Sequence, residues 1–164
     1  MKTGLPAAAS SRGFSLIELM AAATILGVLA TVAVPVMKTT MQRQKEHDLR
    51  LALHDIRRAI DAYKVAAEAG HITVASGASG YPPSLTDLTS GVADPKDSNA
   101  PKQYFLRRVP RDPFSTDSSV PAAATWGLRS FASEPDKPMS GSDVFDVYSK
   151  ATGQGLNGVP YGEW

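Results

Sequence analysis

The chain has 164 residues, with 17 basic and 16 acidic side chains and a net charge of +1. This length allows one globular domain with appended segments. The nearly neutral charge gives no support for a nucleic-acid partner, and the absence of cysteine excludes an intrachain disulfide and a thiol nucleophile.

A short basic leader precedes a long apolar run. The leader, residues 1–13, ends with Gly13, and its loss would leave 15 basic and 16 acidic side chains and a net charge of −1. The run from Phe14 to Met37 would span about 36 Å as a helix, enough to cross a hydrocarbon core of about 30 Å. We therefore predict a transmembrane helix over residues 14–37. Its one charged residue, Glu18, is costly in a membrane and indicates a function.

This junction resembles the cleavage and methylation site of type IV pilin-like proteins. Gly13, Phe14 and Glu18 match the glycine, the phenylalanine and the glutamate at the fifth mature position of that family's motif. The resemblance implies that a prepilin peptidase cuts between Gly13 and Phe14, removes the leader and methylates the new amino group of Phe14. It also implies that Glu18 meets this amino group on a neighbouring subunit during assembly.

An ordinary secretory signal or a generic membrane anchor is the alternative. The apolar run is longer than the 7–15 residues of a secretory signal, and a generic anchor has no use for Glu18. The basic leader favours a cytoplasmic N-terminus. Basic residues that follow the run (Lys38, Arg43 and Lys45) weaken this rule, so the orientation depends on the resemblance.

Pro35 lies inside the predicted membrane helix. A proline removes a backbone donor and crowds the carbonyl of the preceding turn, so we expect a kink near Thr31–Pro35. In pilin-like proteins a proline at the position of Pro35 marks a flexible part of the helix.

From residue 38 to residue 69 the chain is polar but keeps a helical period. Apolar residues at spacings of three and four predict one buried stripe: Leu49, Ala52, Leu53, Ile56, Ala59, Ile60, Tyr63, Ala66 and Ala67. Gly70 suits the residue that ends a helix. Three ion pairs one turn apart are expected on the other side: Glu46–Arg50, Arg57–Asp61 and Lys64–Glu68. His47 and His54 lie there without a third metal ligand, so we expect a solvated face.

The globular region, residues 70–164, is expected to cover the stripe. Ser84 and Asp87 have the spacing of a capping box, which predicts a short helix that ends at Gly91. Trp126–Ser133 and Asp143–Ser149 have strand character, and the polar segment between them predicts a hairpin. The fold class is therefore α+β and pilin-like: a long N-terminal helix covered by a small antiparallel sheet.

Later segments are similar to the major (G-type) pseudopilin of type II secretion systems. They are Tyr81-Pro82, Tyr104-Phe105-Leu106, Pro110-Arg111-Asp112-Pro113-Phe114, Asp146-Val147-Tyr148-Ser149 and Trp164. The resemblance implies a structural pseudopilus subunit that assists protein export across the outer membrane. Implied partners are copies of itself, other pseudopilins, the peptidase, an inner-membrane assembly platform and lipid, but not nucleic acid. The implied location is the inner membrane, with one span, a cytoplasmic N-terminus and a periplasmic C-terminal domain.

One departure concerns calcium, which major pseudopilins bind in the loop after the tyrosine-serine strand, partly through aspartates. Here residues 150–163 contain no aspartate, and the remaining side-chain candidates are Asn157 and Glu163. Calcium takes 6–8 oxygen ligands, including carboxylates. We therefore expect no cofactor and no calcium, with the loop held by Asn157, glycine turns and burial of Tyr161 and Trp164.

Other functions remain as alternatives. A type IV pilin or minor pilin would serve adhesion, motility or DNA uptake, but the absent cysteines and the tyrosine-serine strand favour a pseudopilin. A membrane-anchored enzyme would need a site, and no P-loop, zinc spacing or nucleophile elbow occurs in the sequence. We therefore expect no enzymatic activity.

Overall fold

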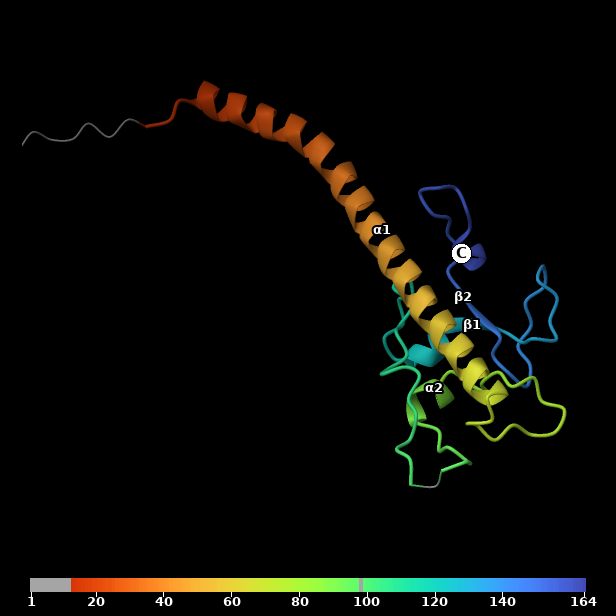
Figure 1. Cartoon of the computed structure of the whole chain (residues 1–164). Helices are drawn as coiled ribbons and strands as arrows, with labels where there is room; N and C mark the ends of the chain where they lie inside the picture. The colour runs from red at the N-terminus through yellow and green to blue at the C-terminus, as the bar shows by residue number, and fades with distance from the viewer. Residues whose placement is uncertain (1–12, 98) are drawn as a thin grey trace, which may run out of the picture. The chain divides into compact units, whose positions relative to one another are not determined.

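The computed structural model describes residues 13–97 and 99–164, apart from the side chains of residues 32–35. In chain order the elements are α1 (Leu16–Glu68), α2 (Asp87–Ser90), the 3-10 helix η1 (Ala122–Thr125), β1 (Trp126–Arg129), β2 (Asp146–Ser149) and the 3-10 helix η2 (Tyr161–Glu163) (Figure 1). The chain divides into two compact units, a first that ends at Met41 and a second from Gln42 to Trp164.

The first unit consists of the N-terminal part of α1 and the residues before it. Its described apolar side chains, such as Leu16 and Leu29, are exposed. The hydroxyls of Thr24 and Thr31 donate to the carbonyls of Met20 and Val28, at 2.8 and 2.7 Å, so these polar groups are satisfied within the helix. α1 continues through residues 32–35, but their side chains lie outside the described residues, and the kink expected at Pro35 stays a prediction.

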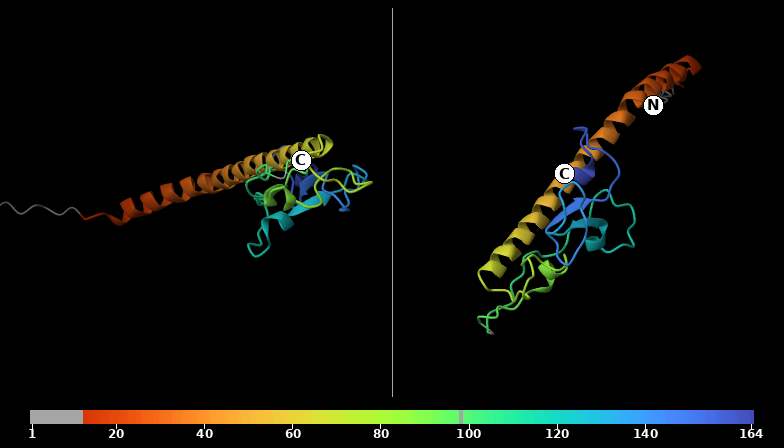
Figure 2. Two further views of the ribbon diagram at one scale, coloured as in Figure 1. Left: turned by 60° about the horizontal axis from the view of Figure 1, so that its bottom comes forward. Right: turned by 90° about the vertical axis from the view of Figure 1, so that its right-hand side faces the viewer.

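The second unit is built on residues 42–68 of α1, and the later segments lie on one side of this part of the helix (Figure 2). All nine apolar residues of the predicted stripe are buried, and Leu49, Ile56 and Ile60 are completely enclosed. The opposite side of the same helix remains exposed, for example at Leu51. The predicted amphipathic helix is therefore confirmed.

α1 ends in a Schellman motif at Gly70, as the sequence predicts. Gly70 has a φ of 75°, which a residue without Cβ adopts at little cost. Its amide donates to the carbonyl of Ala67 at 3.0 Å, and the amide of His71 donates to the carbonyl of Ala66 at 2.9 Å. These two bonds satisfy carbonyls that the end of a helix would otherwise leave unpaired.

The short helix differs from its prediction. α2 begins at Asp87, with Thr86 as its N-cap residue and no side-chain capping bond. The Asp87 carboxylate accepts hydrogen bonds from both the Ser84 amide, at 2.9 Å, and the Ser84 hydroxyl, at 2.7 Å. Half of the capping box is thus formed. The serine hydroxyl binds the carboxylate and does not cap the helix, so the helix starts later than expected.

β1 and β2 form the predicted antiparallel pair, with Trp126 opposite Ser149 and Arg129 opposite Asp146. Both strands are shorter than predicted. The Asp143 carboxylate accepts hydrogen bonds from the Ser130 hydroxyl, at 2.6 Å, and from the Phe131 amide, at 2.9 Å. The Phe131 amide is a backbone donor that a longer ladder would have used, and it binds the Asp143 side chain instead, so pairing stops at Arg129.

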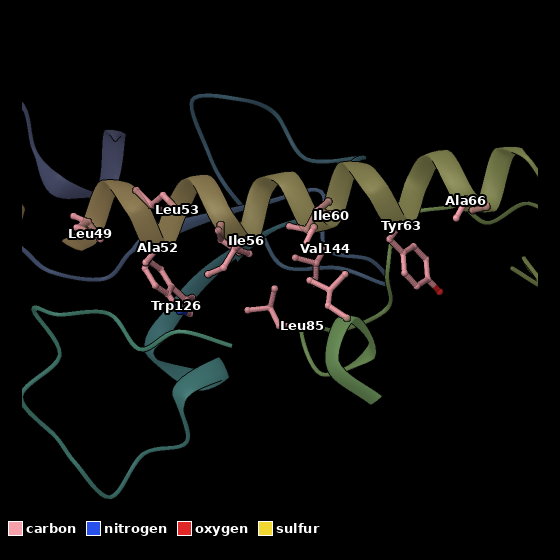
Figure 3. Packing of buried hydrophobic residues seen from close by; sticks show 14 of the residues in the cluster. Leu49, Ala52, Leu53, Ile56, Ile60, Tyr63, Ala66, Leu85, Trp126 and Val144 are labelled. Carbon is pink, nitrogen blue, oxygen red and sulfur yellow. The ribbon is translucent and has the colours of Figure 1, made fainter. Parts of the chain in front are cut away.

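The core lies between the helix stripe and the segments that cover it (Figure 3). Leu85, Trp126 and Val144 pack against the helix, and the indole nitrogen of Trp126 donates to the Pro110 carbonyl at 2.8 Å. Much of this cover is irregular chain, because the sheet has only two strands. The α+β, pilin-like class is confirmed: a long N-terminal helix whose second part carries a small antiparallel sheet.

Candidate functional site

The N-terminal junction lies directly before α1. Gly13, Phe14 and Ser15 are not helical, and the side chain of Phe14 is 76% exposed. The Gly13–Phe14 bond is therefore in open backbone ahead of the first helical turn. A Cβ built on Gly13 would meet nothing within 4 Å among the described residues. The surrounding structure therefore leaves room for a larger residue at position 13. Any requirement for glycine there would come from a protein that binds the junction.

Glu18 lies in the first turn of α1, and its position is fixed by Ser15. The Glu18 amide donates to the Ser15 hydroxyl at 3.3 Å and to the Ser15 carbonyl at 3.1 Å. A hydroxyl that accepts from the amide three residues on is a typical N-cap, and the partial positive charge of a helix N-terminus favours a carboxylate nearby. The cap at Ser15 was missed in the sequence, although Ser-x-x-Glu is a recognisable capping signal.

The segment that follows suits a membrane by length and composition. α1 contains an 18-residue window of high mean hydropathy, and none of that window is buried in the structure. Phe14, Leu26 and Met37, at the beginning, middle and end of the apolar run over residues 14–37, are all exposed. An unburied apolar helix of this length needs lipid or other protein around it, since water solvates it poorly.

The loop after β2 is tied together by its own backbone. The Tyr161 amide donates to the Gly153 carbonyl at 3.1 Å, and the Gly158 amide donates to the Gly155 carbonyl at 2.9 Å. The Val159 carbonyl accepts from the Gly155 amide at 2.8 Å and from the indole nitrogen of Trp164 at 3.2 Å. Three backbone oxygens of the loop, those of Gly153, Gly155 and Val159, therefore already accept hydrogen bonds.

The side chains that could bind calcium are either hydrogen bonded to other groups of the protein or exposed. Asn157 accepts from the Val159 amide at 3.1 Å, which closes a turn, and Glu163 is exposed. The nearby acids Asp143 and Asp146 bind Ser130 and Arg57 instead. Among the described residues no group of three or more His, Cys, Asp or Glu is arranged to hold a metal. The residues present do not fit a calcium site, and the expected lack of calcium stays a prediction.

Two charged residues of α1, Glu46 and Arg57, bind this loop, and both have partners other than those that helical spacing predicts. Glu46 is buried and accepts from the Tyr161 hydroxyl at 3.1 Å, although a pair with Arg50 was expected. Arg57 binds Asp146 at 2.8 Å, although a pair with Asp61 was expected. The third expected pair, Lys64–Glu68, is present at 3.0 Å. Glu46 and Arg57 therefore bind residues far along the chain and not the residues one helical turn away.

The tyrosine in η2 has a perturbed ionisation. Burial raises the pKa of the Tyr161 hydroxyl, the bond from Gln42 lowers it, and the adjacent Glu46 raises it further, so the net pKa is raised. The phenol therefore stays neutral and keeps its proton as a donor to Glu46 at physiological pH.

An exposed apolar N-terminal helix with a carboxylate in its first turn, joined to a compact α+β unit, defines a pilin-like membrane protein. Residues 9–34 match the family model of the prokaryotic N-terminal methylation motif. The type II secretion system core protein G of Klebsiella pneumoniae is 30% identical over 139 residues, covering 81% of this chain and 91% of the relative. The Dickeya chrysanthemi protein of the same name is 29% identical over 158 residues, covering 90% and 94%.

The chain belongs to this family of type II secretion system core protein G, the G-type pseudopilins. A third relative of that name, from Pectobacterium carotovorum subsp. carotovorum, is 33% identical over 113 residues, and the match covers 65% of this chain and 64% of the relative. No solved structure gives a significant match.

Proposed function

We propose that this chain is a structural, non-catalytic subunit of a type II secretion pseudopilus. The observation that carries the proposal is the unburied apolar part of α1 with Glu18 in its first turn, within a segment that matches the methylation motif. The subunit is anchored in the inner membrane through residues 14–37, with its N-terminus cytoplasmic and its C-terminal unit periplasmic. It assembles with copies of itself and with other pseudopilins on an inner-membrane platform, and assists export of folded proteins.

Processing is the first step of the proposed function. A prepilin peptidase cuts between Gly13 and Phe14 and methylates the amino group of Phe14. The exposure of Phe14 and the non-helical backbone before Leu16 support this step, because a protease needs an extended segment that it can reach.

Glu18 then guides assembly. In the membrane its carboxylate lacks water, and the new amino group of Phe14 on a neighbouring subunit supplies a compensating charge. Two opposite charges in a low-dielectric site offset part of each other's desolvation, whereas removing one of them leaves the other unpaired. In the proposed filament Pro35 lets the helix bend as subunits pack.

Replacement of Glu18 by alanine tests this proposal in cells that lack their own copy of the gene. The Glu18→Ala chain should be cut before Phe14 and methylated like the wild type, because the cleaved bond is unchanged. It should assemble few filaments and restore little secretion. Intact-mass analysis of membrane extracts, filament yield and the amount of secreted protein provide the readouts.

Glu68→Ala is the matched control, since Glu68 is an exposed acid at the other end of α1. It should be processed, assemble and secrete normally. A mature N-terminus other than Phe14, or a wild-type filament yield from Glu18→Ala, would contradict the proposal. Loss of motility or adhesion without loss of secretion would instead support the pilin alternative.

A further inference from the structure

We infer that Glu46 fixes the loop after β2 to the helix, and that the second unit of this subunit therefore folds without a divalent cation. The inference concerns the folding of the chain. Its consequence, assembly that does not depend on calcium, rests on the proposed function.

Glu46 is the point at which donors from the helix and the loop converge. Its side chain is 5% exposed. One carboxylate oxygen, Oε1, accepts from the Leu156 amide at 2.9 Å, from the Tyr161 hydroxyl at 3.1 Å and from the Gln42 side-chain amide at 3.0 Å. Gln42 also donates to the Tyr161 hydroxyl oxygen at 3.1 Å. Hydrogen bonds to a carboxylate are strong. This buried acid therefore holds the middle of the loop, at Leu156, and its C-terminal end, at Tyr161.

Aromatic packing completes the attachment. The ring of Tyr161 stacks on Phe114 with centroids 4.1 Å apart and meets the ring of Trp164 edge-on at 5.2 Å. A Cβ on Gly155 would lie 2.2 Å from the Trp164 ring, so only glycine allows this approach. The loop is thus closed by contacts between its own residues and α1.

Two cationic side chains, Arg50 and Arg57, lie beside the loop, whereas a calcium site needs carboxylates there. The guanidinium of Arg50 lies 4.3 Å from the centre of the Trp164 ring. The guanidinium of Arg57 donates to the Trp164 carbonyl at 2.7 Å and to the Val147 carbonyl at 3.1 Å. Arg50 and Arg57 line the same surface pocket as Asn157 and Glu163, and positive charges beside these side chains oppose the binding of a divalent cation. At this loop hydrogen-bond donors converge on the Oε1 atom of Glu46. A calcium site instead directs several oxygens at the ion.

The test compares the full chain in detergent micelles with millimolar calcium chloride and with excess chelator. The two melting temperatures, followed by tryptophan fluorescence, should agree within about a degree. If calcium bound the folded chain at a concentration well above its Kd, the melting temperature would rise by several degrees. Hydrogen exchange at the Leu156 amide should be slow in both buffers, because this amide donates to Glu46.

Glu46→Ala should speed exchange at Leu156 and lower the melting temperature equally in both buffers. Glu46→Gln keeps an acceptor oxygen and should recover part of the protection. Asp48→Ala is the control: Asp48 is exposed on the same helix, accepts from Gln44 at 2.9 Å, and should leave Leu156 unchanged.

Two results would overturn the inference. One is a clear rise in the wild-type melting temperature with calcium, above all if Asn157→Ala or Glu163→Gln removes it. The other is equal exchange at Leu156 in the wild type and Glu46→Ala. Neither result bears on the proposed function, which fails separately if the wild-type chain neither assembles nor supports secretion when calcium is supplied.

Discussion

Asp143 is a single carboxylate that organises the connection between the two strands. It accepts from the Ser130 hydroxyl at 2.6 Å, from the Phe131 amide at 2.9 Å and from the Ser79 hydroxyl. Burial disfavours its charged form, but the bonds from Ser130, Ser79 and Phe131 together outweigh burial, so the pKa of Asp143 is lowered. The carboxylate therefore stabilises the fold in its ionised form.

This lowered pKa predicts a loss of stability in acid. A carboxyl group whose folded pKa lies below its unfolded value, about 3.9, contributes stability above that value and loses it as the pH falls through the folded pKa. Asp143→Asn should therefore melt well below the wild type at pH 7, and the difference should shrink as the pH falls below about 4. Thermal melts across this pH range measure it.

Asp136→Asn is a control in the same connection, because Asp136 is exposed and should change the melting temperature little. A difference between Asp143→Asn and the wild type that stays constant from neutral pH to acid would contradict the role given to the ionised carboxylate.

At the scale of elements, the stripe of α1 is the main support of the second unit. Ile56 is fully buried at its centre, whereas Leu51 is 50% exposed on the other side of the same helix. Ile56→Ala should lower the free energy of unfolding by about 2–5 kcal/mol, because it removes apolar contact and leaves a cavity. Leu51→Ala should change it by less than about 0.5 kcal/mol.

Chemical denaturation of the two variants measures these differences. Alanine favours the helix slightly more than either replaced residue, so a loss of helix propensity does not explain a drop at Ile56. Equal losses at Ile56 and Leu51 would show that the two sides of α1 are covered alike, for example by other subunits.

At the scale of the molecule, the second unit should fold without the first. A fragment from Gln42 to Trp164 contains the whole buried stripe and the segments that cover it, and it keeps Gln42 as a partner of Glu46. The fragment should be soluble without detergent and melt cooperatively, as followed by circular dichroism. Ile56→Asp in this fragment should unfold it, because the charge would be buried without a partner.

The outcome distinguishes two sources of cover for the stripe. A folded fragment shows that the cover is intramolecular, as the structure has it. An unfolded fragment, alongside a full chain that is ordered in filaments, would show that neighbouring subunits are needed to bury Leu49 to Tyr63.

Local patterns in the sequence determined the long helix, its buried stripe and its end. The period of the apolar residues predicted all nine buried positions, and Gly70 marked the Schellman motif. These features depend on residues a few positions apart, where helix geometry fixes which side chains share a face. The methylation motif was readable for the same reason, since Gly13, Phe14 and Glu18 lie within six residues.

Only the tertiary structure decided the partners of Glu46, Arg57 and Asp143, whereas the local pair Lys64–Glu68 followed from helical spacing. Arg57 reaches Asp146 and Glu46 reaches Leu156, partners about ninety and one hundred and ten residues away. Asp143 likewise ends the strand ladder earlier than alternation alone predicts. An ion pair one helical turn apart in solvent contributes only a few tenths of a kcal/mol, whereas a buried carboxylate without donors is costly. Such groups take the partners that the fold brings to them, and sequence spacing does not reveal those distances.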